Sequence, residues 1–229
     1  MSGIVLLPGF ANNERVWTHQ IDTLTDLCDV HVFIMNHETT RTEMVQSLLK
    51  EAPSCFILAG HSMGGWIAQA VAAMAPERVE KLILLNTWAT PDPKMMSIQR
   101  DVCECLKRGQ IIEVMEEQLP LLIHPSRVQD LPLVRQLQTM ITSFPESVLV
   151  QQLEAMLGDY SSLHHHPAII APTLVVHSDG DALFPNEHEA IASGIKDAEL
   201  ALIEDCGHAS PLEKPEIVTE LIRSFIQRE

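Results

Sequence analysis

The stretch from residue 56 to residue 65 constrains the fold more than any other part of the chain. It reads FILAGHSMGG: an apolar run ends at Gly60, Ser62 follows, and an Ala-rich amphipathic segment begins at Trp66. This order predicts a buried strand, a turn of one residue and then a helix. Gly60 and Gly64 lack a Cβ atom, so the backbone can double back tightly around Ser62. The Ser62 hydroxyl is therefore expected to project beyond the strand end.

Short apolar runs alternate with helical patterns on both sides of this stretch. The alternation stops between about residues 91 and 166, where the chain is Met- and Leu-rich, helical in pattern and cut by Pro120, Pro125, Pro132 and Pro145. Strands separated by helices favour a parallel sheet with right-handed crossovers. We therefore expect a core of residues 1–90 and 167–229 with a helical cap inserted at 91–166. The expected strands are 4–7, 29–35, 54–59, 81–86, 173–177 and 199–203, and the expected helices are 17–27, 42–50, 63–75, 187–194 and 214–228.

Two residues after later strands could serve Ser62. A serine hydroxyl becomes a good nucleophile only when a base takes its proton and a third group orients that base. His208 follows the strand at 199–203, and Asp181 follows the strand at 173–177. Functional groups of parallel α/β sheets gather at the carboxyl ends of strands, so both are expected near Ser62. Asp179 and Asp205 remain alternatives for the orienting acid.

Together these motifs resemble the α/β-hydrolase family, in particular its small capped esterases of the acyl-carrier-protein methyl ester esterase type. The resemblance covers the chain outside the cap, and it implies an α/β-hydrolase fold with a mostly parallel sheet of about six strands and a helical cap insertion. The matching pieces are LLPGF at 6–10, GHSMGG at 60–65, PERV at 76–79, Asp181 with Pro185, and Gly207 and His208 with Glu213 and Pro215.

The resemblance also implies a role for each site residue. Ser62 would be the nucleophile, His208 the general base and then acid, and Asp181 the group that orients His208. The backbone N–H groups of Phe10 and Met63 would form the oxyanion hole. This chemistry requires no cofactor and no metal ion, and none is expected.

Three features depart from the family pattern. Pro8-Gly9 stands where His-Gly is usual, which removes a side chain that commonly braces the oxyanion loop. The first strand begins at residue 4, so the two leading antiparallel strands are missing. The sequence NHET at 36–39 replaces a Gly-rich turn. These differences affect the pocket mouth and leave every expected catalytic group in the chain.

Large apolar residues near the predicted turn are candidates for the acyl pocket. Trp88 follows a strand end at the cap junction, and Phe184 lies beside Asp181; Phe10 and Met63 flank the expected oxyanion hole. Each could equally be a packing residue. The cap offers an apolar lid, whose residues could also form the cap's own core: Met95, Met96, Ile111, Ile112, Met115, Leu119, Leu121 and Leu122.

The histidines at 164–166 invite comparison with a metal site. Consecutive side chains point in different directions, and no carboxylate or Cys spacing supports ligation. We expect them to form a solvated hinge before the returning strand. His61 adjoins Ser62, but neighbouring residues in such a turn diverge, so it is expected either to pack in the core or to support the catalytic residues from behind.

Composition narrows the possible partners. The formal net charge of −16 argues against nucleic acid and anionic membranes. No apolar run approaches the length of a membrane span, and the N-terminus lacks a signal-peptide pattern. Five cysteines without a C-x-x-C pair favour free thiols in a reducing compartment, so we expect a cytoplasmic protein. The partner expected from the hydrolase resemblance is a small-molecule ester.

The sequence therefore predicts a serine hydrolase that cleaves a small-to-medium carboxylic ester through an acyl-enzyme on Ser62. The same three side chains could instead hydrolyse a thioester, a lactone or a carbon–carbon bond, or cleave a hydroxynitrile. A non-enzymatic ligand receptor that kept the fold is a further alternative, because fold alone does not determine function.

Overall fold

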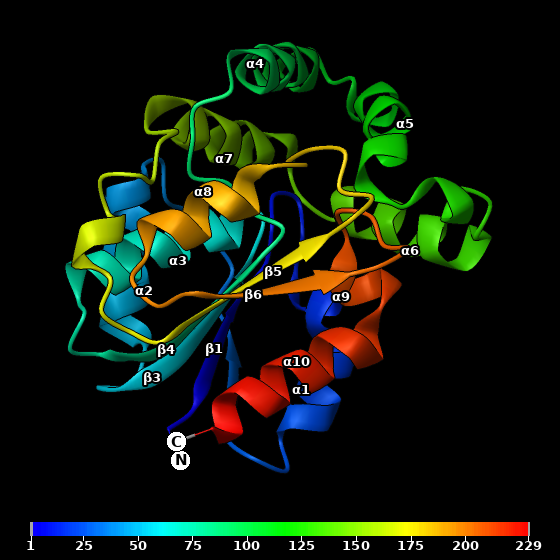
Figure 1. Ribbon diagram of the computed structural model, residues 1–229. Coiled ribbons are helices and arrows are strands. Elements are labelled where there is room, and N and C mark those ends of the chain that lie inside the picture. Colours follow the sequence, from blue (N-terminus) through cyan, green and yellow to red (C-terminus); the bar gives the residue numbers. More distant parts are fainter. Residues whose placement is uncertain (1, 229) are drawn as a thin grey trace.

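The fold is built around one parallel sheet. A computed structural model describes residues 2–228. Within this range the sheet contains six strands in the order β2-β1-β3-β4-β5-β6, and every neighbouring pair is parallel (Figure 1). The expected sheet without leading antiparallel strands is confirmed. The strands are β1 (Ile4–Leu7), β2 (Val30–Val32), β3 (Phe56–His61), β4 (Val79–Leu85), β5 (Thr173–Ser178) and β6 (Glu199–Ile203).

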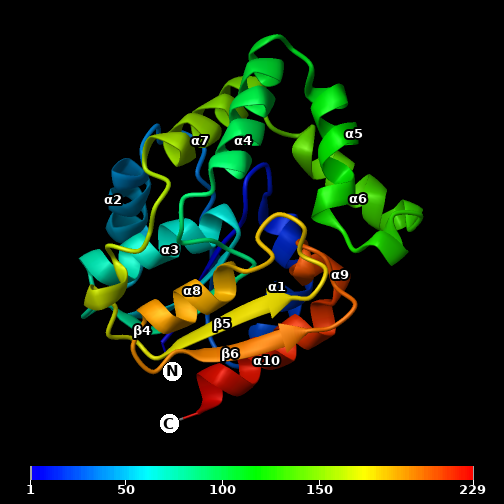
Figure 2. The ribbon, with the colours of Figure 1, turned by 45° about the horizontal axis from the view of Figure 1, so that its top comes forward.

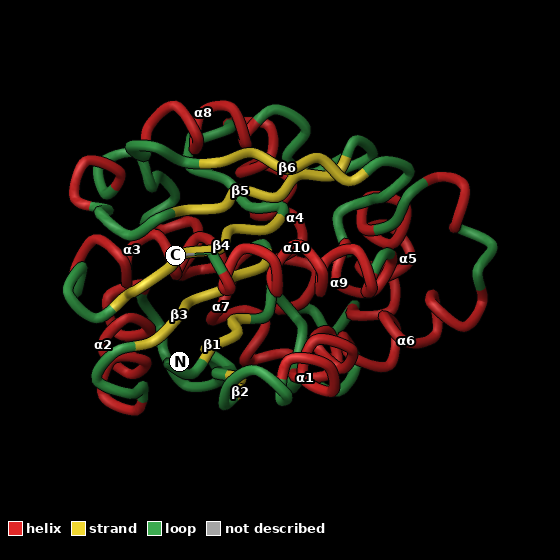
Figure 3. The backbone as a smooth tube through the Cα atoms, turned by 60° about the horizontal axis from the view of Figure 1, so that its bottom comes forward, coloured by secondary structure: helices red, strands yellow, loops and turns green. Residues whose placement is uncertain are grey.

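Helices cover both faces of the sheet. One face carries α2 (Arg41–Glu51), α3 (Met63–Met74) and α8 (Glu187–Gly194), and the other carries α1 (Thr18–Leu24) and α10 (Pro215–Gln227) (Figure 3). Side chains of β1 alternate between the two layers, as the pleat requires. Val5 and Leu7 join the core on the α3 side, whereas Ile4 and Leu6 join the core on the α10 side. This two-sided burial explains the all-apolar strand sequences.

Four helices are inserted between β4 and β5. They are α4 (Pro93–Lys107), α5 (Ile111–Leu122), α6 (Leu131–Ile141) and α7 (Glu146–Gly158). Figure 2 shows these inserted helices gathered beyond the carboxyl ends of the strands, with α4 lying along α7. The prediction that Pro120 interrupts this region is wrong, because Pro120 lies within the last turn of α5. Its ring costs that turn one backbone hydrogen bond, and the helix ends only two residues later.

Several boundaries differ from those expected. The predicted helix 17–27 is a 3-10 turn over Glu14–Trp17 followed by the shorter α1, and the predicted strand 29–35 pairs only over β2. Short strands at a sheet edge have few partners to extend them. The final helix is preceded by a separate short helix, α9 (Ser210–Glu213).

The histidine stretch is not a solvated hinge throughout. His164 is exposed, but His166 is buried at the start of a 3-10 turn over His166–Ala168. The Nε2 atom of His166 lies 2.8 Å from Oε1 of Gln69 in α3. The expectation of a solvated hinge is therefore wrong for His166, which ties the returning chain to the core. Among residues 2–228, no three side chains of the metal-binding types are grouped to hold an ion.

All five cysteines carry free thiols. Between residues 2 and 228, every helix is too short or too polar to cross a bilayer.

Candidate active site

Ser62 occupies a strained turn between β3 and α3. Its φ of 53° and ψ of −120° are unusual for a residue with a side chain. The turn is anchored because the Ser62 N–H donates to the Leu85 carbonyl at 2.9 Å and the Ser62 carbonyl accepts from the Thr87 hydroxyl at 2.8 Å. These bonds hold the Ser62 side chain above the end of the sheet.

The two glycines around Ser62 allow this turn to form. A Cβ atom on Gly60 would lie 2.3 Å from the Gly64 carbonyl oxygen, and one on Gly64 would lie 2.2 Å from the Leu7 carbonyl oxygen. Both separations are far below van der Waals contact, so β1, β3 and α3 can meet here only around glycine.

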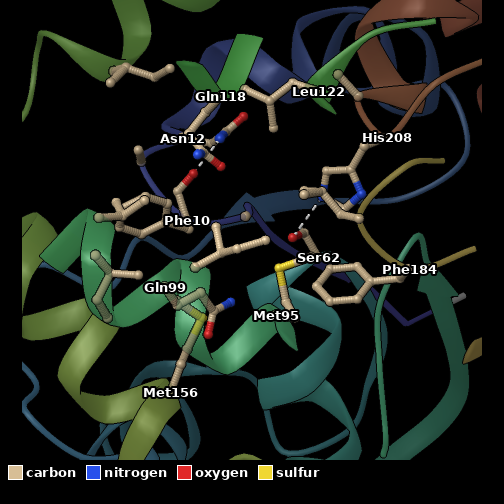
Figure 4. Close-up of a pocket in the computed structure, with 18 of the residues that line it drawn as sticks. Phe10, Asn12, Ser62, Met95, Gln99, Gln118, Leu122, Met156, Phe184 and His208 are labelled. Carbon is tan, nitrogen blue, oxygen red and sulfur yellow. Dashed lines mark hydrogen bonds between the residues drawn. The ribbon is translucent and has the colours of Figure 1, made fainter. Parts of the chain in front are cut away.

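His208 lies within hydrogen-bonding distance of Ser62. Its Nε2 atom is 2.9 Å from the Ser62 Oγ atom, and the imidazole is buried (Figure 4). The loop that carries it follows β6 and is held at two points. The Gly207 N–H donates to the Glu213 carboxylate at 2.9 Å, and the His61 Nε2 atom lies 2.8 Å from the His208 carbonyl oxygen.

Asp181 lies on the other side of the His208 ring. Its two carboxylate oxygens are 3.0 and 3.1 Å from the His208 Nδ1 atom. The Asn86 amide donates to Oδ2 at 3.0 Å, and the Leu183 and Phe184 N–H groups donate to Oδ1 at 3.0 and 3.1 Å. Burial opposes the charged form of Asp181, but the charge of His208 and these hydrogen bonds outweigh it and lower its pKa to about 2. Asp181 is therefore a carboxylate at any ordinary pH.

The alternative acids lie elsewhere. The Asp179 carboxylate accepts from the N–H groups of Asp205 and Cys206 at 3.1 and 3.2 Å, which shapes the loop before His208. Asp205 is exposed in a left-handed conformation with a φ of 51°. The structure thus brings Asp181, and neither alternative, into contact with His208.

His61 packs directly beneath this row of side chains. Its ring centroid lies 5.0 Å from that of His208 and 6.4 Å from that of Trp17. Burial, reinforced by the charge of His208, lowers the pKa of His61 to about 3. His61 therefore stays neutral and has the packing position expected from the sequence.

The loop after β1 passes against Ser62. A Cβ atom on Gly9 would lie 3.1 Å from the Ser62 Cβ atom, so the Gly9–Phe10 backbone borders the serine directly. Met63 begins α3, where the first N–H groups of a helix lack intrahelical partners. Phe10 thus follows the loop residue that borders Ser62, and Met63 follows Ser62 directly at the start of α3.

Two polar side chains brace that loop where the usual histidine is missing. The Asn12 amide donates to the Phe10 carbonyl at 2.6 Å. Gln152 of α7 accepts from the Ala11 N–H at 3.2 Å and donates to the Met35 carbonyl at 2.7 Å. Sequence reasoning missed Gln152, although a Gln among the apolar positions Leu149, Leu153 and Met156 of a helix is a sign of a buried polar contact.

An apolar cavity of about 100 Å³ opens above Ser62 and His208. Its lining comes from the β1 loop, from Trp88 and Phe184, and from the inserted helices; Figure 4 shows Phe10, Phe184 and Met95 of this lining around Ser62. The Trp88 ring stacks on Phe184 at 4.9 Å, and Phe184 meets His208 edge-on at 5.5 Å. These aromatic contacts form one continuous wall from the cavity to the imidazole.

Only some of the expected pocket residues line this cavity. Phe10, Trp88 and Phe184 do, and so do Met95, Met115 and Leu122 of the inserted helices. The expectation that the Met63 side chain contributes is wrong, because that side chain is packed in the core of the α3 layer. Ile112 is about half exposed and faces away from the cavity, so it too is no part of the lining.

The sequence profile of the alpha/beta hydrolase family matches residues 4–221. The chain belongs to this family. The resemblance deduced from the sequence motifs is thereby confirmed.

Curated members of the family with similar sequences differ in the substrates that their names state. RutD of Azorhizobium caulinodans, provisionally named a carbamate hydrolase, is 26% identical over 97% of this chain and 90% of its own length. The pimeloyl-[acyl-carrier protein] methyl ester esterase of Nitrosomonas europaea is 24% identical over 93% of this chain and 91% of its own length. Such distant alpha/beta hydrolases support hydrolysis in general and no particular substrate.

Solved structures of the family superpose closely. A thermophilic esterase from Thermogutta terrifontis has a TM-score of 0.85 and 29% identity, covering 99% of this chain and 90% of its own. The enol-lactonase from Burkholderia xenovorans has a TM-score of 0.90 at 18% identity, covering 99% of this chain and 92% of its own. The second comparison supports the alpha/beta hydrolase fold alone.

Proposed function

We propose that the protein is a serine hydrolase that cleaves a small-to-medium carboxylic ester through an acyl-enzyme on Ser62. The observation that carries this proposal is the buried row Ser62–His208–Asp181, with heavy-atom separations of 2.9 and 3.0 Å, at the floor of an apolar cavity. The esterase relatives add support from outside the chain.

The first half of the reaction forms the acyl-enzyme. The Asp181 carboxylate accepts a hydrogen bond from the Nδ1–H group of His208, which leaves Nε2 unprotonated and able to take the Ser62 proton. The Ser62 oxygen then attacks the ester carbonyl, and the His208 imidazolium that forms is stabilised by the Asp181 carboxylate. His208 passes its proton to the leaving alcohol as the carbon–oxygen bond of the ester breaks.

The second half repeats these roles with water. His208 takes a proton from water, the resulting hydroxide attacks the acyl carbonyl, and the Ser62 oxygen leaves with the proton returned by His208. The free acid departs, and Ser62 is regenerated. No atom is supplied by a cofactor in this cycle.

The N–H groups of Phe10 and Met63 are the proposed oxyanion hole. Both tetrahedral intermediates place negative charge on the former carbonyl oxygen, and one such donor typically contributes about 3 kcal/mol of barrier reduction. The braces from Asn12 and Gln152 would keep the Phe10 segment rigid, so the donor is oriented before the reaction begins.

The wall of the cavity favours an apolar acyl group. Trp88, Met95 and Phe184 line this cavity, and Figure 4 shows Met95 and Phe184 beside Ser62. Burying apolar substrate surface there contributes about 25 cal/mol for each Å² removed from water. We propose residues 91–166 as the cap that completes this pocket over a core of residues 1–90 and 167–229.

The test is hydrolysis of p-nitrophenyl esters from acetate to dodecanoate by the wild-type protein and by Ser62→Ala. We expect turnover that depends on Ser62 and reaches a maximum at a short or medium chain. Absence of Ser62-dependent turnover across the series would overturn the proposal.

Further substrates separate the alternatives. A p-nitrophenyl carbamate, a thioester and a lactone assayed in parallel show which acyl bond is preferred. Ester preference supports the proposal, whereas faster Ser62-dependent cleavage of the carbamate would move the assignment to the chemistry in the RutD name.

A further inference from the structure

Gln99 is a polar residue at a position where its helix otherwise buries apolar side chains. The inward stripe of α4 consists of Met95, Val102, Cys103 and Leu106, all buried. Gln99 lies one turn from Met95 and one turn from Cys103, so it occupies the middle of this stripe. Packing alone would favour an apolar residue at this position.

The Gln99 carboxamide lines the apolar cavity without a protein partner. Its Oε1 atom is shielded from solvent and accepts no hydrogen bond from any group within residues 2–228. The residue as a whole is partly buried, but this oxygen is shielded, and shielded polar atoms are almost always bonded because an unpaired one is destabilising. A ligand with a hydrogen-bond donor would supply the missing partner of this oxygen on entering the cavity.

The fully buried glutamines behave differently. Gln69 donates to the Gly65 and Trp88 carbonyls and accepts at Oε1 from His166, and Gln152 is bonded at both ends of its amide. Gln20 also has an unpaired Oε1, but it does not line the cavity above Ser62. Gln99 differs from these three residues because its unpaired amide oxygen belongs to a side chain that lines the cavity.

The position of Gln99 indicates which part of the substrate it meets. His208 protonates the leaving alcohol, so the alcohol portion lies on the His208 side of Ser62. Figure 4 shows Gln99 on the other side of Ser62, near Met95 and Met156. The acyl chain of a bound ester would therefore extend toward this side. Gln118, from α5, lies toward Leu122 and Asn12 instead.

We propose that Gln99 binds a hydroxyl group carried on the acyl chain, so that the preferred substrates are esters of hydroxy acids. This inference rests on the proposed function of the Ser62 site. A hydroxyl suits an amide because it can donate to Oε1 and accept from Nε2, while the rest of the chain contacts the apolar wall. One neutral hydrogen bond formed in such a desolvated site gives on the order of a tenfold preference in kcat/KM.

The test compares p-nitrophenyl hexanoate with its 3-hydroxy and 6-hydroxy derivatives, two positions from which the ester does not readily cyclise. We expect the wild-type protein to favour one hydroxy ester over hexanoate by on the order of tenfold in kcat/KM. Gln99→Leu should abolish this preference while still hydrolysing hexanoate. Gln118→Leu, the same change on the other side of the cavity, should keep it.

Stability gives a second readout of the same variant. Because Gln99→Leu removes a shielded, unpaired amide oxygen from a partly buried position, its melting temperature should rise by about 2–4 °C. Gln99→Met is the substitute if the leucine variant fails to fold.

The outcomes distinguish the two proposals. Ser62-dependent hydrolysis of hexanoate with no preference for either hydroxy ester would overturn the hydroxyl subsite and leave the esterase standing. A preference that survives in Gln99→Leu would also overturn it. Loss of all Ser62-dependent turnover in the wild-type protein would instead be a failure of the proposed function.

Discussion

Replacing Asp181 by asparagine should set His208 in the wrong tautomer. The Oδ1 atom of Asp181 accepts from two backbone N–H groups, those of Leu183 and Phe184, and lies 3.1 Å from His208 Nδ1. The Oδ2 atom lies 3.0 Å from Nδ1 and accepts from the Asn86 side-chain amide alone. In Asp181→Asn the side-chain oxygen should keep the place of Oδ1, because an NH₂ group there would oppose two fixed donors. The NH₂ group then faces His208, whose Nδ1 atom must become an acceptor.

This rearrangement removes the base from Ser62. With Nδ1 unprotonated, the proton of neutral His208 lies on Nε2, which points at the Ser62 hydroxyl. In the same change studied in serine proteases, kcat falls by about 10⁴, which corresponds to about 5 kcal/mol of barrier. Asp181 does not line the cavity, so KM should change little.

The assay is steady-state hydrolysis of the best p-nitrophenyl ester, with nitrogen NMR of the His208 ring to report the tautomer. Asp179→Asn is the matched control, because Asp179 bonds the Asp205 and Cys206 N–H groups and does not touch His208. It should retain more than about a tenth of wild-type kcat. A fall of less than about tenfold in Asp181→Asn would refute the role assigned to Asp181.

Two further predictions concern folding. The pKa of His61 is about 3 in the folded protein and about 6.5 in the unfolded chain, so between these values the unfolded chain binds the extra proton and stability falls as the pH is lowered. Between pH 7 and pH 5 the wild-type protein should therefore lose about 2 kcal/mol more unfolding free energy than His61→Phe, as measured by urea titration. Equal losses in the two proteins would contradict the lowered pKa of His61. Gly60→Ala should cost more than about 3 kcal/mol because its Cβ would meet the Gly64 carbonyl at 2.3 Å. Gly158→Ala, where no atom lies within 4 Å, should stabilise by about 0.4–1 kcal/mol, and similar urea midpoints for the two variants would rule out the steric explanation.

Local patterns were sufficient to predict the sheet and the turn. Strands such as β1 and β3 are apolar at every position because helices bury both of their faces, and that property is visible in the residues themselves. The Ser62 turn was equally visible, because it depends on Gly60 and Gly64 at fixed spacing.

Contacts between residues far apart in the chain could not be predicted from the local sequence. Gln152 bonds Ala11, which is 141 residues away, and His166 bonds Gln69, which is 97 residues away. Neither partner can be inferred from neighbouring residues, because each depends on how the inserted segment folds back on the core. The prediction for the Met63 side chain failed for a related reason: Met63 adjoins Ser62 in the sequence, but the turn buries its side chain in the core of the α3 layer.

Covalent labelling of Ser62 tests the central claim most directly. A p-nitrophenyl alkylphosphonate mimics the tetrahedral intermediate and is not released by water as an acyl group would be. Intact-protein and peptide mass spectrometry should detect a single adduct on Ser62, with none on Ser62→Ala and strongly slowed labelling of His208→Ala. An unreactive Ser62, or an adduct that forms equally fast without His208, would contradict a nucleophile activated by the Ser62–His208–Asp181 row.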